Sequence, residues 1–239
     1  MDNKIFETMD QAVADIRDGA TIMFPGFGRT GYPRNLIAAL LRQGARGLTG
    51  ISNRPGNPGA LMDVGHLIEA GRIKKMVCAF TASPYPSRKS SLEIKEEAGE
   101  IVSDLVPQGT FVERIRAAGA GIGGFYTATG VGTEIAEGKE RRIIDGREYI
   151  LEFPLPADYA FIRAYRADTS GNLQFRLSQR NFNPIMAMAA TTTIVEVEHE
   201  IVGSGAIDPD AVHTPGIVVD RLVKIPPPPD GIWDAATDD

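Results

Sequence analysis

Cysteine, histidine and long apolar runs are scarce in this sequence. One cysteine, Cys78, occurs among 239 residues, so no disulfide can form within the chain. The three histidines do not complete the spacing of a zinc site, and no stretch approaches the ~18 apolar residues of a membrane span. The first residues are too polar for a secretory signal. We therefore expect a cytoplasmic protein with no bound metal and no contact with a membrane.

Basic residues are also too few for a nucleic-acid binder. The chain has 25 Lys and Arg against 31 Asp and Glu, a net charge of −6, whereas nucleic-acid binding needs a basic excess or stripe. With 43% hydrophobic residues, the chain can bury a core and is not expected to be disordered. Its length suits one large core, so we expect a single domain over residues 1–239.

Glycine and proline are frequent and divide the chain into short segments. In roughly the first 120 residues, apolar strands alternate with helices, a pattern typical of an α/β fold with an open, mostly parallel sheet and flanking helices. The expected strands cover 20–24, 48–52, 75–80 and 101–106, and the expected helices cover 6–17, 33–41, 61–69, 93–98 and 111–118.

The second half predicts a β-rich extension of the same domain. An Asp145-Gly146 pair between two strand-like runs over 143–153 is typical of a tight hairpin. The prolines at 226–229 favour an extended polyproline segment. Further expected elements are strands over 157–164 and 191–197 and an apolar helix over 184–189.

A glycine-rich loop follows the first expected strand. The segment Gly26-Phe-Gly28-Arg-Thr-Gly31 matches the G-x-G-x-x-G pattern of dinucleotide-binding proteins. In those proteins the third glycine lies inside the helix, but here Pro33 delays the helix, and Asn53 replaces the ribose-binding acid. Three interpretations stay open: a substrate loop that exposes backbone N–H groups, which we favour, a plain tight connection, and dinucleotide binding.

Asn53 and Gln108 each follow an expected parallel strand. Both should lie at the carboxyl edge of the sheet, where ligands bind in open α/β folds, and the 26–31 loop should reach the same edge. Amide side chains can donate to a carboxylate or a thioester carbonyl, and backbone N–H groups can stabilise an oxyanion. The alternative for either amide is that it only caps a loop.

A series of motifs extends over nearly the whole chain. The longest is 18–33, Asp-Gly-Ala-Thr-Ile-Met-Phe-Pro-Gly-Phe-Gly-Arg-Thr-Gly-Tyr-Pro. Others are Ser52-Asn53, Pro107-Gln-Gly-Thr110, Glu113-Arg-Ile-Arg-Ala-Ala-Gly-Ala-Gly121, Thr129-Gly-Val-Gly-Thr133, Arg180-Asn-Phe-Asn-Pro184 and His213-Thr-Pro-Gly216. Together and in this order they resemble the alpha subunits of family I CoA-transferases, 3-oxoacid enzymes that use succinyl-CoA to activate acetoacetate or 3-oxoadipate.

The resemblance implies a ping-pong reaction. In this family a glutamate carboxylate attacks the acyl-CoA thioester to give a mixed anhydride, the CoA thiolate attacks the glutamyl carbonyl, and the acceptor acid reverses these steps. That glutamate lies in a Ser-Glu-Asn-Gly motif of the beta subunit, and this sequence contains no such motif. The resemblance therefore implies an alpha subunit without a catalytic residue. It would be active only in a heterodimer with a beta subunit, or in a heterotetramer with two copies of each.

The resemblance also implies what this chain supplies. Residues matching Asn53 and Gln108 line the family's active site beside the glutamate, and Phe27 and Tyr32 are expected to pack against acyl or pantetheine groups. The CoA thioester is a substrate, so no cofactor is implied. The implied substrate-binding residues are Gly26, Phe27, Gly28, Gly31, Asn53 and Gln108.

Three departures from the family pattern leave the substrate and the reaction open. Pro25 replaces a glycine and removes a backbone N–H, Arg34 replaces a residue that is often acidic, and Arg54 stands where a second Asn is common. Arg54 either pairs with a distal acyl carboxylate or is solvated. The alternative functions are an acyl-CoA hydrolase subunit on the same scaffold and a non-catalytic binding module.

The other polar residues are expected to be structural. Cys78 should be an inert core thiol, and the 180–184 motif should brace a helix start or a subunit interface. The three histidines lack a triad or metal partner in the sequence. Glutamates expected on solvated faces are Glu93, Glu96, Glu97, Glu148 and Glu196.

Overall fold

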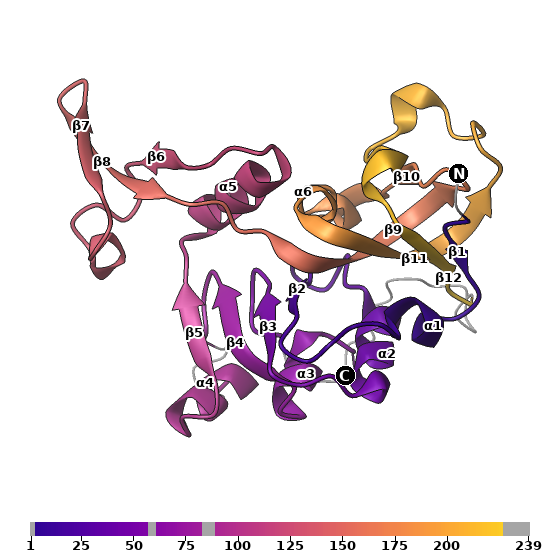
Figure 1. Ribbon diagram of the computed structural model, residues 1–239, viewed down its shortest axis with the longest axis horizontal. Coiled ribbons are helices and arrows are strands. Elements are labelled where there is room, and N and C mark those ends of the chain that lie inside the picture. The colour runs from indigo at the N-terminus through magenta and orange to yellow at the C-terminus, as the bar shows by residue number, and fades with distance from the viewer. Residues whose placement is uncertain (1–2, 57–60, 83–88, 227–239) are drawn as a thin grey trace.

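The computed structural model describes residues 3–56, 61–82 and 89–226 (Figure 1). Most of the 81–88 loop, and all of the expected polyproline segment except Pro226, lie outside these ranges. In the described part of the chain, no helix has the length and apolarity needed to cross a membrane.

An open sheet forms the centre of the molecule, and its strands are nearly all parallel. In spatial order they are β1 (Ile5–Phe6), β12 (Arg221–Lys224), β11 (Ala190–Val202), β9 (Ala157–Asp168), β2 (Thr21–Met23), β3 (Leu48–Ile51), β4 (Ile73–Cys78) and β5 (Val102–Leu105). Each neighbouring pair in this order is parallel, and β10 (Leu173–Gln174) adds antiparallel to β9. The expected α/β fold class is confirmed.

Helices cover both faces of this sheet, as a parallel sheet requires. Because successive strand residues point to opposite faces, Ile22 of β2 packs in one buried cluster and Met23 in the other. The first cluster includes apolar residues of α1 (Met9–Val13), α2 (Arg34–Gln43), α3 (Val64–Glu69) and α4 (Ser91–Glu97), and the second those of α5 (Gln108–Gly119) and α6 (Asn183–Met188). Short 3-10 helices are Glu134–Ala136, Leu177–Arg180, Pro209–Ala211 and Gly216–Val218.

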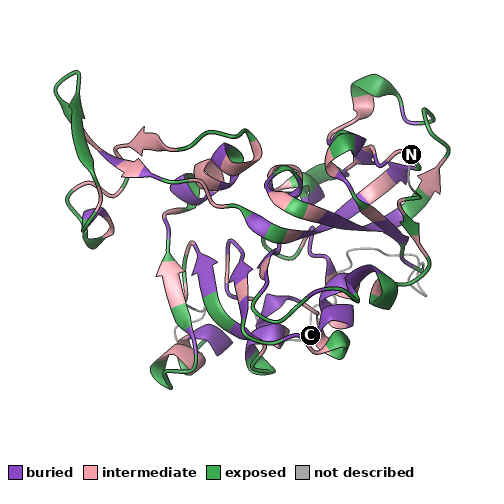
Figure 2. Cartoon of the chain, viewed as in Figure 1, coloured by how far each residue is buried: buried purple, intermediate pink, exposed green. Residues whose placement is uncertain are grey.

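A second, antiparallel sheet forms the expected extension, in the order β6 (Phe125–Thr127), β8 (Arg147–Glu152) and β7 (Arg141–Ile144). Asp145 and Gly146 have φ angles of 50° and 76°, so they make the two-residue turn that the sequence predicts. The β7–β8 hairpin projects from the body of the molecule (Figure 1). Every residue of β7 is exposed (Figure 2).

The structure corrects three expectations about the elements. The helix expected over 6–17 is only Met9–Val13. It begins late because Thr8 caps it together with Gln11, and because Ile5 and Phe6 pair with β12. The strands expected over 157–164 and 191–197 are longer and lie in the main sheet instead of the extension. Gln108 is the first residue of α5 and does not precede the helix.

Candidate active site

Asn53 and Gln108 meet at the carboxyl edge of the main sheet. Asn53 follows β3 and continues its ladder, because the Ala79 N–H donates to the Asn53 carbonyl at 3.1 Å. The Gln108 Nε2 donates to the Asn53 Oδ1 at 2.8 Å, although 55 residues separate them. The structure therefore brings the two amides together, as the strand order predicts, with Asn53 buried and Gln108 exposed.

The first turn of α5 adds backbone donors beside these amides. The first N–H to bond within the helix is that of Phe111, which donates to the Pro107 carbonyl at 2.8 Å. The N–H groups of Gln108, Gly109 and Thr110 therefore have no acceptor inside the helix. Because a helix N-terminus also carries positive partial charge, this turn favours an anionic group or an oxygen that develops negative charge.

A pocket of about 660 Å³ opens at this turn. The Phe182 ring contacts those of Phe27 and Phe111, with centroids 6.4 and 6.0 Å apart. An apolar wall with a few polar groups is typical of a small-molecule site. The lining includes Phe27, Gln108, Gly109, Thr110, Phe125 and Asn181.

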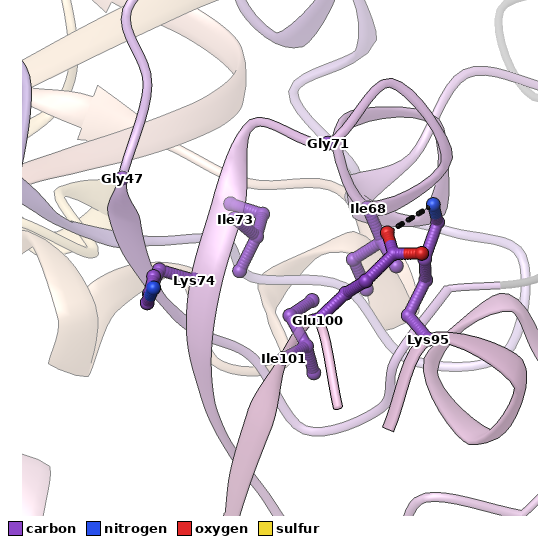
Figure 3. Close-up of a pocket in the computed structure, with 8 residues that line it drawn as sticks. All are labelled: Gly47, Ile68, Gly71, Ile73, Lys74, Lys95, Glu100 and Ile101. Atoms are coloured by element: carbon purple, nitrogen blue, oxygen red, sulfur yellow. Dashed lines mark hydrogen bonds and ion pairs between the residues drawn. The ribbon is translucent and has the colours of Figure 1, made fainter. Parts of the chain in front are cut away.

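A smaller pocket lies at the opposite, amino edge of the sheet (Figure 3). It has a volume of about 120 Å³, and its walls include Ile73 at the start of β4 and Ile101 just before β5. Lys95 and Glu100, which pair with each other at 2.5 Å, form one side of this pocket (Figure 3). Since ligand sites of parallel sheets form at the carboxyl edge, the pocket at the start of α5 is the candidate active site.

The glycine-rich loop reaches the candidate active-site pocket through Phe27. The Phe27 and Thr30 N–H groups donate to each other's carbonyls at 3.1 and 3.2 Å, which closes the loop into a tight turn. The Gly26 N–H donates to the Asn181 Oδ1 at 3.1 Å, so it is already engaged within the chain. Apart from its two chain neighbours, no described residue lies within 4 Å of the place that a Gly28 Cβ would take. The loop therefore presents the half-exposed Phe27 ring to the pocket and leaves open space at Gly28.

The same loop does not have the geometry of a dinucleotide-binding turn. α2 begins at Arg34 with Pro33 as its cap residue, so Gly31 lies outside the helix. In dinucleotide-binding folds the third glycine packs the helix against the strand. The structure therefore does not support that alternative.

Gly26→Ala is expected to be much more damaging than Gly28→Ala. Both glycines have positive φ, 122° and 61°. Alanine costs about 1–2 kcal/mol in the left-handed region of Gly28, and at least as much at the φ of Gly26. At Gly26 the added Cβ would also lie 2.5 Å from the buried Tyr32 ring, and such overpacking costs about 1–3 kcal/mol more. Thermal unfolding of the two variants measures this difference. Equal losses in Tm would contradict the close packing of Gly26 on Tyr32.

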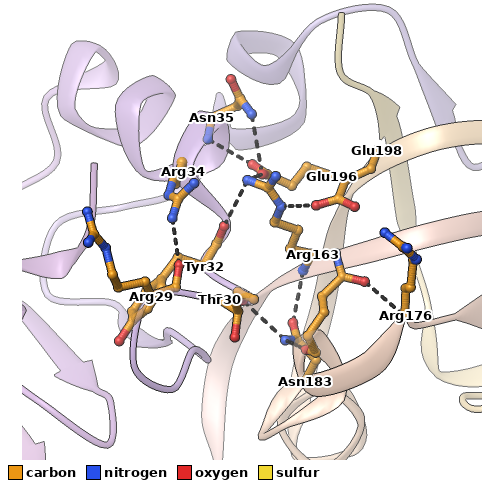
Figure 4. Close-up of polar contacts among 12 residues, drawn as sticks. Arg29, Thr30, Tyr32, Arg34, Asn35, Arg163, Arg176, Asn183, Glu196 and Glu198 are labelled. Carbon is orange, nitrogen blue, oxygen red and sulfur yellow. Dashed lines mark hydrogen bonds and ion pairs between the residues drawn. The ribbon is translucent and has the colours of Figure 1, made fainter. Parts of the chain in front are cut away.

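Tyr32 lies beneath the loop and not in the pocket. It is 2% exposed, and burial raises the pKa of its hydroxyl to about 12. The Arg54 guanidinium lies 5.3 Å from the Tyr32 ring centroid and pairs with Asp63 at 3.4 Å. The expectation that Tyr32 packs against a ligand is therefore wrong, and Arg54 is partnered within the chain instead of solvated. Arg34 is also engaged, since it donates to the Arg29 carbonyl at 2.7 Å (Figure 4).

A buried charged cluster lies next to the end of the loop (Figure 4). Arg163 of β9 pairs with Glu198 at 2.5 Å and Glu196 at 3.4 Å, both on β11. Glu196 is fully buried, so the expectation of a solvated face is wrong for it. Its carboxylate accepts the N–H groups of Asn35 and Leu36, at 2.8 and 3.0 Å, which ties α2 to β11. Burial raises the pKa of Glu196, against the lowering effect of Arg163.

Two asparagines that the sequence does not place in the site hold the glycine-rich loop. Asn181 accepts the Gly26 N–H, and the Asn183 Nδ2 donates to the Gly31 carbonyl at 3.1 Å. The 180–184 motif, expected to brace a helix start, does begin α6, and it also braces this loop. The motif itself is the only sequence signal, because these contacts span 155 and 152 residues.

Two of the histidines have structural partners, as expected. The Nδ1 atoms of His66 and His213 accept the backbone N–H groups of Asp63 and Phe175, at 3.2 and 2.9 Å. Within the described ranges, no group of three or more His, Cys, Asp and Glu residues is arranged to hold a metal ion.

Cys78 is buried in β4, as expected of a core thiol. Burial raises the pKa of its thiol to about 12. Because the thiolate is the reactive form, we expect the native chain to resist iodoacetamide at about pH 8 and to take up one label when unfolded. Mass spectrometry of the labelled chain checks this. Labelling of the native chain as fast as the unfolded one would contradict it.

The sequence is similar to known proteins over nearly its whole length. Residues 6–225 match the family model described as coenzyme A transferase. The chain is 48% identical over 227 residues to the A subunit of 3-oxoadipate CoA-transferase from Pseudomonas putida, covering 94% of this chain and 95% of that protein. It is 51% identical over 208 residues to the A subunit of succinyl-CoA:3-ketoacid coenzyme A transferase from Xanthomonas campestris pv. campestris, covering 87% and 83%.

Among solved structures, an acyl-CoA transferase of Escherichia coli O157:H7, in a thioester complex with CoA, aligns with a TM-score of 0.79 at 24% identity. The alignment covers 98% of this chain and 49% of the other, so this chain spans about half the length of that protein. At this identity the likeness shows the fold alone. The family match over nearly all of the sequence, together with the identities to curated relatives, shows that the chain belongs to the coenzyme A transferase family.

Proposed function

We propose that the chain is the alpha subunit of a heteromeric CoA-transferase that moves CoA from succinyl-CoA to a 3-oxoacid of the 3-oxoadipate or acetoacetate type. The observation that carries this proposal is the hydrogen bond between Gln108, which lines the pocket, and the buried Asn53 behind it, because it holds an uncharged amide at the ligand-binding edge of the sheet. The names of the relatives, which are subunits of 3-oxoadipate and 3-ketoacid CoA-transferases, support the substrate class.

The proposed reaction needs a nucleophile from the partner subunit. Glu113 lines the pocket but is paired with Arg116 at 2.6 Å, and its side chain is 44% exposed, so it lacks the surroundings of an activated carboxylate. A partner glutamate attacks the thioester carbonyl and expels the CoA thiolate, which leaves a mixed anhydride. The thiolate then attacks the glutamyl carbonyl and releases the first acid. The acceptor acid reverses both steps.

This chain would stabilise the negative charge that develops on a carbonyl oxygen in each of those steps. Each attack places negative charge on a carbonyl oxygen, and preorganised N–H donors lower the energy of such a state. The Gln108 amide and the N–H groups of the first α5 turn, which have no acceptor inside the helix, are the proposed donors at the pocket. The Phe27 and Phe182 rings offer apolar surface to the acyl or pantetheine portion. The CoA thioester is a substrate, so the proposed reaction uses no separate cofactor.

The assembly requires a second kind of chain, because the relatives are themselves named as single subunits of their enzymes. We propose a heterodimer or a heterotetramer with two copies of each chain, located in the cytoplasm where acyl-CoA substrates are made and used. The alternatives are a subunit of an acyl-CoA hydrolase and a non-catalytic binding module on the same scaffold.

Co-expression with a CoA-transferase beta subunit from the same genome tests the proposal. The purified complex is assayed with succinyl-CoA plus 3-oxoadipate or acetoacetate, and the chain alone is the control. We expect CoA transfer by the complex and none by the chain alone. Thioester loss without an acceptor acid would favour the hydrolase, and no complex with no activity would favour the binding module.

A further inference from the structure

The glycine-rich loop is held from one side by two asparagines, Asn181 just before α6 and Asn183 at its first position. Asn181 makes two bonds to the loop, accepting the Gly26 N–H at 3.1 Å and donating to the Thr30 carbonyl at 3.3 Å. Asn183 makes one, donating to the Gly31 carbonyl at 3.1 Å. The two amides therefore fix the beginning and the end of the loop at once.

Both asparagines are themselves anchored. The Asn181 Nδ2 also donates to the Ser178 carbonyl at 2.9 Å. Asn183 is fully buried, and its Oδ1 accepts the backbone N–H of Arg163 at 2.9 Å (Figure 4). Arg163 in turn reaches the Tyr32 carbonyl at 3.4 Å. The loop is thus attached through short polar contacts to β9, a central strand of the sheet.

The contact between loop and asparagines leaves no spare room. Gly31 has a φ of 77°, and a Cβ on it would lie 2.4 Å from the Asn181 Nδ2 and 2.8 Å from the Gln179 carbonyl oxygen. Glycine at 31 and asparagine at 181 therefore fit each other. A substitution of Gly31 or of Asn181 therefore displaces the same backbone, that of the glycine-rich loop.

We propose that Asn181 and Asn183 are positioning residues that hold the glycine-rich loop, and with it Phe27, in place at the mouth of the active-site pocket. Asn183 is buried and can act on a substrate only through the loop. The expected loss of kcat rests on the proposed CoA transfer, but the expected loosening of the loop does not. A loop displaced by about 1 Å can cost on the order of 100-fold in rate without loss of folding.

Steady-state kinetics of the assembled enzyme test the kinetic consequence. We expect Asn181→Ala and Asn183→Ala to lower kcat by about 10- to 100-fold, with KM for the acyl-CoA changed by less than about threefold, because misplacement affects the transition state more than ground-state binding. Unchanged kcat in a folded Asn181→Ala enzyme would overturn the proposal.

Asn172 provides a matched control. It is half-buried like Asn181, and it accepts the Gly216 N–H at 2.8 Å and donates to Asp168 at 2.8 Å, so it braces another loop with the same chemistry. It lines a different pocket from the proposed active site. Asn172→Ala should lower Tm about as much as Asn181→Ala and leave kcat unchanged. An equal loss of kcat in both variants would mean that only general destabilisation is measured, and would overturn the positioning role.

A double-mutant cycle with Gly31→Ala separates positioning from direct substrate contact. Asn181 also lines the pocket, so its truncation alone does not separate the two effects. Since Gly31→Ala and Asn181→Ala displace the same backbone, the double variant should lose far less activity than the product of the two single losses. Strict multiplicativity would contradict the proposal.

Hydrogen exchange tests the clamp, by which we mean the hold of Asn181 and Asn183 on the 26–31 loop, and it needs no enzymatic reaction. In the assembled protein, amide exchange of a peptide spanning 26–31 should be faster in Asn181→Ala than in the wild type and in Asn172→Ala. Unchanged exchange would refute the clamp even if the enzyme is active. Absence of CoA transfer in the wild-type complex, with accelerated loop exchange in the variant, would instead refute the proposed function and retain the clamp.

Discussion

Gln108→Ala is expected to lower kcat of the assembled enzyme by ~10²–10³-fold, the usual effect of removing one donor that faces a developing oxyanion. The Gln108 side chain lies at the pocket, and its amide is oriented by the 2.8 Å bond to Asn53. Asn53→Ala should cause a loss of the same order, because it removes the partner that holds Gln108. Both variants should still assemble with the partner chain, since each removes one side-chain amide and keeps the backbone of β3 and α5.

Gln43 supplies the control for this prediction. It is an exposed glutamine at the end of α2, and its Nε2 donates to the Ile16 carbonyl at 2.8 Å. Gln43→Ala removes the same group remote from the pocket and should leave kcat unchanged. Steady-state rates at saturating acyl-CoA and acceptor measure the three variants. Wild-type rates in both Asn53→Ala and Gln108→Ala would show that these amides only cap loops.

Arg163→Met is expected to have the largest effect on stability. It leaves the buried carboxylates of Glu196 and Glu198 without their guanidinium, and removal of one partner of a buried pair costs about 3–5 kcal/mol. The free energy of unfolding, from urea denaturation at fixed protein concentration, checks this. Arg42→Met is the control, because its pair with Asp10 is more than half exposed and should cost no more than about 1 kcal/mol.

The loss caused by Arg163→Met should depend on pH with a defined sign. Burial raises the pKa of Glu196 above its ordinary value, and removing the guanidinium raises it further. A carboxyl whose pKa is raised on folding contributes stability below its unfolded pKa and loses it as the pH rises through the folded value. The variant should therefore be least impaired at acidic pH, where the carboxyl is protonated. A loss that grows toward acidic pH would contradict this account of the cluster.

The candidate site illustrates what strand order can predict. Asn53 follows β3 and Gln108 follows β5, the strands on either side of β4, so parallel pairing places both residues at the same edge of the sheet. The tight hairpin at Asp145 follows from local chemistry in the same way, because aspartate and glycine tolerate positive φ. Both predictions needed only residue type and short-range pattern.

Glu196 shows where such reasoning fails. An acidic residue between Val195 and Val197 fits the alternating pattern of a half-solvated strand. β11 instead lies in the interior of the sheet with both faces covered, so Glu196 is buried. Its carboxylate pairs with Arg163 and accepts an N–H group of the first turn of α2. No local pattern shows that the neighbouring strand carries the compensating charge.

By itself, the sequence determined the fold class and the placement of Asn53 and Gln108 at the carboxyl edge of the sheet, because each depends on local propensity and on parallel strand order. The tertiary structure alone decided the shape of the glycine-rich loop. Its Gly26 N–H is bound by Asn181, 155 residues away, and its end is attached through Asn183 to Arg163 on a central strand. Contacts between residues so far apart in the sequence form only when the whole sheet is assembled, because the fold decides which buried polar groups meet and can hydrogen-bond.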